Sequence, residues 1–222
     1  MGWFDHVLGS EPMKNREQEI SPGPLDLSLI SKVSFDSILK LLLDGKSKVT
    51  IPESEMSIFA ESFIDLGGTH WLSRYFLDPS DHWLQIHTHG NGGDFQVESV
   101  LLFETIVRAD IDSGERLSCL VAPWALIGNP TLTHEGLEYS REWGVETGQT
   151  ALLPLTEYVH HQDDEDDQDP DSIMHRSVLY SRDTGLTNRR EFLLFGLDDD
   201  VSFTVARGIS LYLSDLHVSY PG

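Results

Sequence analysis

The sequence predicts an α+β fold that is predominantly antiparallel β, either a sandwich or a partly open barrel, with a short N-terminal helical arm. Two observations lead to this prediction. Apolar and polar residues alternate in many short runs, and turn-forming residues separate those runs. The two stretches with apolar residues at helical spacing both lie before residue 45.

The stretch from Ser57 to His89 shows the alternation most clearly. Two turn signals, Gly67-Gly68 and Asp78-Pro79-Ser80-Asp81, divide this stretch into three strands. Because each break is short, consecutive strands should run antiparallel. Three linked strands with apolar faces are about the smallest sheet that is stable in water. We therefore expect the rest of the chain to be organised around this stretch.

Residues 1–27 are predicted to form an N-terminal arm or linker, and residues 28–222 a single β-rich domain. The residues from 10 to 27 are polar and include three prolines, which is typical of an extended linker. The strongest helix prediction covers Ser34–Asp44. Ser34 is a good N-cap, apolar residues recur at helical spacing, and Gly45 is a stop signal.

Several further strands are predicted outside the central stretch. They cover residues 48–51, 95–108, 137–143, 150–161, 174–182, 191–197, 201–206 and 209–216. The strand over 95–108 has apolar residues on both faces, so we expect other elements to cover both of its sides. Gly208 is expected to mark a bend that separates the last two strands.

The charge of the chain is strongly negative. It has 37 acidic and 15 basic residues, which give a net charge of −22. Such a surface repels nucleic acid and anionic membranes, so we expect no nucleic-acid partner. It favours a protein partner with a basic surface, although the charge also serves simply to keep a protein soluble.

The segment 162–171 has seven acidic residues in ten and is predicted to be an exposed loop. It lacks the glycine and the spacing of a calcium-binding loop. A solvated loop is the simplest interpretation. Its candidate docking residues for a basic partner are Asp163, Asp164, Glu165, Asp166 and Asp167.

The sequence favours a cytoplasmic protein without a transmembrane segment. No apolar run approaches the length of about 20 residues that spans a bilayer. The lone Cys119 rules out an internal disulfide bond and fits a reducing compartment. Near the start, Trp3, Phe4, Val7 and Leu8 form a small apolar face at helical spacing. This face suits either a peripheral membrane or partner contact through residues 3–8, or packing against the protein body.

His87 and His89 are the candidate metal ligands. On a strand, two residues that are two positions apart point to the same face, a spacing that suits metal chelation. Ordinary polar residues at a strand end are the alternative. The sequence contains no nucleophile elbow, phosphate-binding loop, dinucleotide fingerprint or zinc-protease motif. We therefore expect no catalytic residue and no cofactor other than a divalent metal.

Short motifs spread along the chain resemble the YjfK-like family of uncharacterised bacterial proteins. The motifs are Ile64-Asp65-Leu66-Gly67, Arg74-Tyr75-Phe76-Leu77, Trp83-Leu84-Gln85-Ile86, Tyr139 with Arg141 and Trp143, Glu157, Tyr180 with Arg182, and Glu191. The resemblance covers about residues 25 to 217. Members tend to be encoded beside membrane-stress proteins of the phage-shock-protein-A type. This implies a cytoplasmic accessory role near the membrane but no catalytic residue.

Two functions follow as expectations. The first is a non-enzymatic cytoplasmic interaction or accessory protein of a bacterial envelope-stress system, which presents its acidic surface to a partner. The alternative is a β domain that binds a metal or a small ligand, or an enzyme, through His87 and His89 with a nearby carboxylate.

Overall fold

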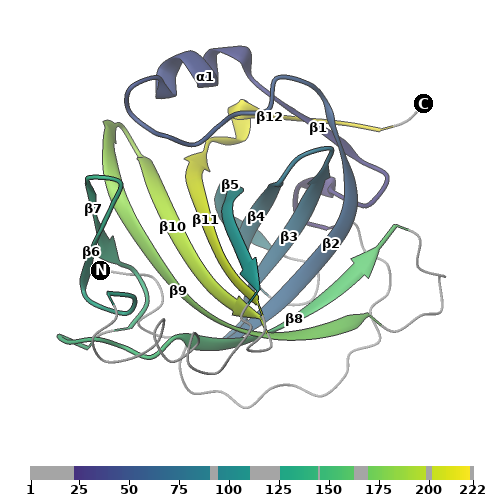
Figure 1. The fold of residues 1–222 in the computed structure, drawn as a ribbon. Coiled ribbons are helices and arrows are strands. Elements are labelled where there is room, and N and C mark those ends of the chain that lie inside the picture. The colour runs from purple at the N-terminus through teal and green to yellow at the C-terminus, as the bar shows by residue number, and fades with distance from the viewer. Residues whose placement is uncertain are drawn as a thin grey trace.

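The computed structural model describes residues 23–90, 95–110, 126–144, 146–162, 170–198 and 202–220. Within these ranges twelve strands join into one sheet, accompanied by one α-helix and two short 3-10 helices (Figure 1). The strands are β1 (Lys32–Phe35), β2 (Met56–Gly67), β3 (His70–Asp78), β4 (His82–His89), β5 (Gln96–Asp110), β6 (Thr131–His134), β7 (Leu137–Arg141), β8 (Leu153–His161), β9 (Asp171–Leu186), β10 (Arg189–Asp198), β11 (Ser202–Leu211) and β12 (Leu216–Ser219). The helices are η1 (Pro24–Asp26), α1 (Ser37–Leu43) and η2 (Leu213–Asp215).

Eight of the strands close into a barrel. Their order is β2-β3-β4-β5-β11-β10-β9, and β8 pairs with both β9 and β2 to complete the circle. All neighbours in this circle are antiparallel. The prediction of a mainly antiparallel β protein and of a barrel is confirmed. The barrel is closed rather than partly open, and a sandwich is not confirmed.

The barrel interior is filled by one hydrophobic cluster to which every barrel strand contributes. Because side chains alternate across a strand, a cluster that includes all eight strands must lie inside the circle. One residue from each strand in order around the circle is Ile64, Leu72, Trp83, Leu101, Ala206, Phe192, Leu179 and Leu155. The remaining members, apart from Trp143 in the loop after β7, lie on the same strands.

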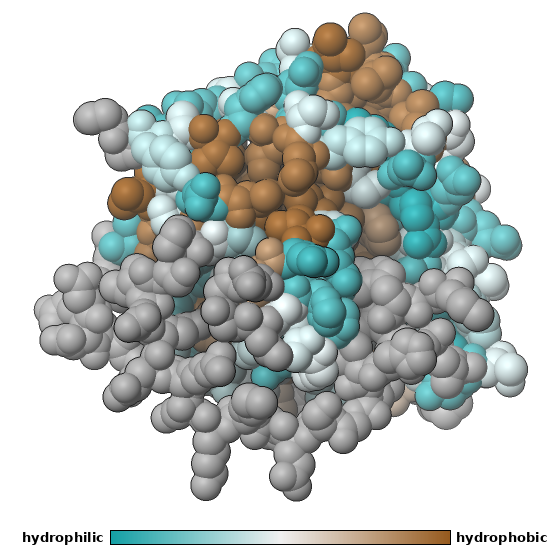
Figure 2. All heavy atoms as spheres, turned by 180° about the vertical axis from the view of Figure 1, so that it is seen from behind, coloured by the Kyte–Doolittle hydropathy of each residue, from teal (hydrophilic) through white to brown (hydrophobic). Residues whose placement is uncertain are grey.

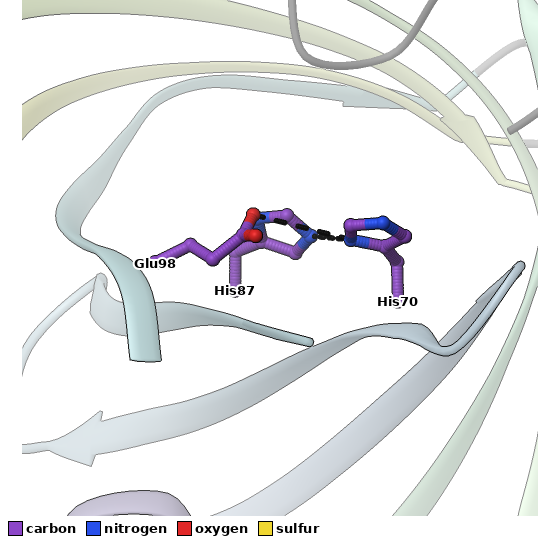
Figure 3. A group of neighbouring side chains, drawn as sticks. All are labelled: His70, His87 and Glu98. Carbon is purple, nitrogen blue, oxygen red and sulfur yellow. Dashed lines mark hydrogen bonds and ion pairs between the residues drawn. The ribbon is translucent and has the colours of Figure 1, made fainter. Parts of the chain in front are cut away.

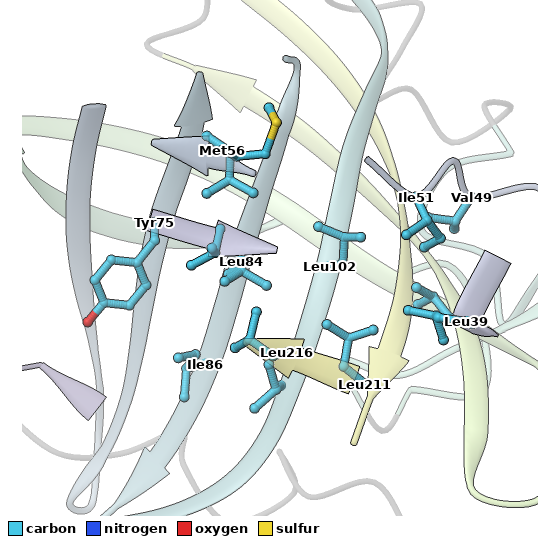
Figure 4. Close-up of a cluster of buried hydrophobic side chains, with 14 of the residues drawn as sticks. Leu39, Val49, Ile51, Met56, Tyr75, Leu84, Ile86, Leu102, Leu211 and Leu216 are labelled. Carbon is cyan, nitrogen blue, oxygen red and sulfur yellow. The ribbon is translucent and has the colours of Figure 1, made fainter. Parts of the chain in front are cut away.

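A second cluster lies on the outer face of β3, β4, β5 and β11, where α1 and the β1–β12 ribbon cover the barrel (Figure 4). The labelled members are Leu39, Val49, Ile51, Met56, Tyr75, Leu84, Ile86, Leu102, Leu211 and Leu216. On β5, Leu101 and Phe103 point inward whereas Val100 and Leu102 point into the outer cluster. The expectation that this strand is covered on both faces is therefore confirmed.

The helix begins later than the sequence predicts. Asp36, not Ser34, is the N-cap, and its carboxylate accepts the amide of Ile38 at 2.7 Å. Ser34 and Phe35 belong instead to β1, where they pair with β12. Cross-strand pairing with a distant segment has overridden the local helical pattern. As a result Leu39 is buried while Ile38 is 58% exposed.

Two further expectations about strands are wrong. Residues 48–51 form no strand, because carboxylates of the barrel, rather than a neighbouring strand, accept the amides of Lys48 and Thr50. Gly208 does not separate two strands, since β11 runs through it from Ser202 to Leu211. The Phe103 ring lies so close to Gly208 that a Cβ added there would be 2.5 Å from a ring carbon. The glycine is needed for this contact and not for a turn.

Apolar side chains gather in the upper half of the face shown in Figure 2, the half that holds α1, β1 and β12. The most exposed of the apolar residues on and around these elements are Ile30, Ile38, Leu41 and Leu213. Within the described ranges, the structure contains no helix with the length and apolar character needed to cross a bilayer. The predicted boundary between residues 27 and 28 stays a prediction.

Candidate functional site

Three histidines meet where β3 begins and β4 ends. The β3–β4 hairpin pairs His70 with His89 and Leu72 with His87. Because Leu72 belongs to the interior cluster, its cross-strand neighbour His87 also lies on the interior face. The ring of His70 lies 5.1 Å from that of His87 and 4.5 Å from that of His89, measured between ring centroids.

A β-bulge adds a carboxylate to this group. On β5, Ser99 pairs with His87 and Val97 pairs with Thr88, so Glu98 is an extra residue without a partner on β4. A bulge of this kind redirects a side chain that regular alternation would send to the other face. The Glu98 carboxylate consequently lies 2.8 Å from Nδ1 of His87 (Figure 3).

The His87 ring contacts both of its neighbours. Its Nδ1 faces Glu98, and its Nε2 is 3.0 Å from Nδ1 of His70 (Figure 3). The Glu98 oxygen is 3.9 Å from the same His70 atom. A carboxylate on one imidazole nitrogen and a second ligand beside the other nitrogen is the arrangement usual around protein-bound metals.

Burial favours the neutral form of the His87 imidazole. Burial, together with the neighbouring His70 and His89, lowers the pKa of His87 to about 3. The His87 side chain is 2% exposed, whereas that of Glu98 is 37% exposed. A neutral imidazole keeps a lone pair that is available to a metal ion. Among the described residues, His70, His87 and Glu98 are the one group of at least three potential metal-ligating side chains whose ligand atoms lie within 4.8 Å of one another.

The two predicted metal ligands, His87 and His89, occupy different positions relative to the cluster. His87 is central to the cluster, whereas His89 is beside it and packs against His70 at a tilt without belonging to the close group. Sequence reasoning missed His70 and Glu98. Counting outward from the turn at Asp78–Asp81 pairs Leu77 with His82, and continuing that count would have found His70 opposite His89. Glu98 left no such signal, because the bulge that redirects it has no sequence pattern of its own.

The predicted interaction residues are not among those that the structure describes. Asp163, Asp164, Glu165, Asp166 and Asp167 fall between the described residues 162 and 170, and Trp3 and Phe4 precede residue 23. Their predicted roles stay predictions.

A second polar group lies on the interior face of the barrel. The Arg74 guanidinium donates to Glu157 at 2.7 Å and to Gln85 at 3.0 Å. Nε2 of His175 lies 3.2 Å from the same Glu157 oxygen. The Arg74 and Glu157 side chains are less than one-tenth exposed. A buried, hydrogen-bonded ion pair of this kind fixes how strands β3, β4, β8 and β9 meet.

A comparison with known protein families shows which family the chain belongs to. Residues 3–217 match the family described as "Protein of unknown function (DUF2491)". The chain belongs to this family. It is also similar to the "Uncharacterized protein YjfK" of Escherichia coli (strain K12), with 32% identity over 102 residues.

That similar stretch covers 46% of this chain and 44% of the relative, so it spans less than half the length of the relative. No solved structure matches the chain significantly. The resemblance to the YjfK-like family is confirmed.

Proposed function

We propose that the protein binds a divalent transition-metal ion of the zinc class at the interior face of β3 and β4. His70 Nδ1 and His87 Nε2 are the ligands, and Glu98 holds His87 in place from β5. The observation that carries this proposal is the 3.0 Å separation of the two ring nitrogens, together with the Glu98 carboxylate 2.8 Å from Nδ1 of His87.

Distances and ligand type support this assignment. Zinc–imidazole bonds are about 2.0–2.1 Å long, so two nitrogens about 3 Å apart suit neighbouring positions around one ion. Imidazole favours zinc, copper and nickel, whereas calcium and magnesium prefer oxygen ligands. The half-buried His89 ring is close enough to His70 to supply a third ligand after a side-chain rotation.

Glu98 has a different role from the histidines in this proposal. Its negative charge, 2.8 Å from Nδ1 of His87, favours a proton on that nitrogen and leaves the lone pair of Nε2 for the ion. The alternative, an ordinary polar strand end, accounts less well for a nearly fully buried His87 and for a bulge that turns a carboxylate toward it.

Metal titration of chelator-treated protein tests the proposal. We expect one Zn²⁺ or Co²⁺ ion per chain, measured by elemental analysis and by the visible spectrum of the cobalt form. His70→Ala and His87→Ala should abolish binding, and Glu98→Gln should weaken it about 10–100-fold. His217→Ala is the matched control, because His217 is an exposed histidine on β12. A wild-type protein that takes up neither ion contradicts the proposal.

The expected role as a cytoplasmic accessory protein of an envelope-stress system stays a second hypothesis, as does a peripheral membrane contact through residues 3–8. The residues on which both hypotheses depend lie outside the described ranges. One further observation, the overall charge of −22, supports a basic protein partner. Capture of such a partner should weaken as salt is raised.

A further inference from the structure

Four side chains form a compact block on the outer face of β2 and β8. Glu61 lies directly opposite His160, and Phe63 lies directly opposite Tyr158. The rings of Phe63 and Tyr158 stack with 5.3 Å between their centroids, and the His160 ring is 6.1 Å from that of Phe63. Tyr158 is 37% exposed, so the stacked pair borders solvent.

Glu61 is unusual among the half-buried and buried carboxylates of this protein. Within the described part of the chain it forms neither a hydrogen bond nor an ion pair, whereas Glu157 and Glu191 each contact an arginine. Burial raises the pKa of Glu61, and no arginine or lysine of the described ranges forms an ion pair with it to offset that effect. Its other cross-strand neighbour is Tyr75, which supplies no positive charge. A partly desolvated carboxylate without a counter-charge costs free energy in the isolated protein.

A positively charged group would complete this block. The face of an aromatic ring attracts a cation through its quadrupole, and the attraction grows when the cation is desolvated. A guanidinium or ammonium group above Phe63 or Tyr158 would also supply the positive counter-charge that the Glu61 carboxylate lacks. We propose that Glu61, Phe63, Tyr158 and His160 form a docking surface for a basic protein segment, with an arginine or lysine side chain in contact with this block.

Charge complementarity selects this occupant. The chain carries a net charge of −22, which repels nucleic-acid phosphates and anionic lipid headgroups. The segment 162–171, which joins β8 to β9, contains seven acidic residues. An approaching basic segment is therefore attracted over a long range and is then held at the block by short-range contacts.

Binding of a fluorescently labelled peptide of alternating arginine and alanine tests the proposal on the full chain. Glu61→Gln and Tyr158→Ala should each weaken binding about fivefold to tenfold. Glu138→Gln is the matched control, because it removes the same charge from an exposed residue of β7. Its effect should stay within about twofold. Equal effects of Glu61→Gln and Glu138→Gln would overturn the proposal, since they would indicate a general charge effect.

Stability separates a docking role from a structural one. Because Glu61 has no partner in the described chain, Glu61→Gln should leave the melting temperature unchanged or raise it while binding weakens. A lower melting temperature would show that Glu61 supports the fold and would overturn the proposal. A third experiment measures binding to vesicles of phosphatidylcholine and phosphatidylglycerol. Vesicle binding that depends on Tyr158, without peptide binding, would assign the surface to a membrane and overturn the basic-segment proposal.

Discussion

The carboxylate of Glu191 accepts a hydrogen bond from the main-chain amide of Lys48 at 3.0 Å, although 143 positions separate the two residues in the chain. The same carboxylate binds Arg182 at 2.9 Å and accepts the Tyr139 hydroxyl. Arg182 in turn donates to the carbonyl of Lys46 at 2.7 Å. A fully buried charge on β10 thus fastens the loop after α1 to the outside of the barrel.

This contact predicts how stability depends on pH. Burial alone would raise the pKa of Glu191, but hydrogen bonds from Arg182, Tyr139 and the Lys48 amide hold it below its ordinary value. A carboxylate whose pKa is lower when folded contributes stability above its unfolded pKa of about 4.3. That contribution is lost as the pH falls through the folded pKa. Urea unfolding from about pH 7 to about pH 3 measures it.

Glu191→Gln should lower the free energy of unfolding by about 3–5 kcal/mol at neutral pH, because it leaves the half-buried Arg182 without its fully buried counter-charge. The acid dependence of the variant should also be shallower than that of the wild type. Glu138→Gln serves as the exposed control. Identical pH profiles for Glu191→Gln and the wild type would contradict this account.

The ion pair inside the barrel predicts strong coupling between Arg74 and Glu157. Arg74→Met and Glu157→Gln should each cost about 3–5 kcal/mol, because each leaves a buried group without its partner. The double variant should cost less than the sum of the two, which a double-mutant cycle of urea unfolding measures. Simple additivity would show that the pair contributes little beyond packing.

The close approach of Phe103 to Gly208 predicts a sharp response to a single methyl group. Gly208→Ala should destabilise the protein by about 1–3 kcal/mol, because the buried Phe103 ring must move. Gly148→Ala is the control, since a Cβ there meets no atom within 4 Å. The control should change stability by less than about 0.5 kcal/mol. Thermal melts of both variants compare them directly.

The two faces of α1 predict opposite outcomes for two leucines. Leu39 is 1% exposed and Leu41 is 75% exposed. Leu39→Ala should cost about 2–5 kcal/mol, because it opens a cavity beneath the helix. Leu41→Ala should be nearly neutral for stability. A cost for Leu41→Ala similar to that for Leu39→Ala would mean that the outer face of α1 is covered in solution.

The histidine ligands predict metal selectivity. Zn²⁺ at about one hundred times its dissociation constant should add about 2.7 kcal/mol to the free energy of unfolding. Ca²⁺ and Mg²⁺ should have no such effect, because the proposed ligands are imidazole nitrogens. Thermal shift with each ion, before and after a chelator, measures the difference. Stabilisation by Ca²⁺ equal to that by Zn²⁺ would point to carboxylate ligands elsewhere.

Alternation and turn residues were sufficient to predict the central hairpins. The strands expected around Gly67-Gly68 and around Asp78–Asp81 became β2, β3 and β4, because short turns leave few alternatives for neighbouring strands. The start of α1 was predicted wrongly because Ser34 and Phe35 pair with β12, which lies at the other end of the sequence. Closure by β8 was not predicted for the same reason, since pairing between distant strands has no local pattern.

The candidate site was predicted in part. His87 and His89 share a face because of strand periodicity, which the sequence shows directly. His70 requires the hairpin register, and Glu98 requires a bulge that interrupts the periodicity. A regular strand that places Ser99 on the side of His87 would have sent Glu98 away from it. Departures from regular geometry therefore determined the part of the site that the sequence did not reveal.

The pairing of β1 with β12 brings the first and last strands of the barrel protein side by side. Joining residues 23 and 220 by a short linker should therefore need little rearrangement, and new ends opened in the turn between β6 and β7 would give a circularly permuted protein. Removing either β1 or β12 would leave the other strand without this pairing. Any shortening on the N-terminal side should stop before Leu27, because its side chain is fully buried in the outer cluster.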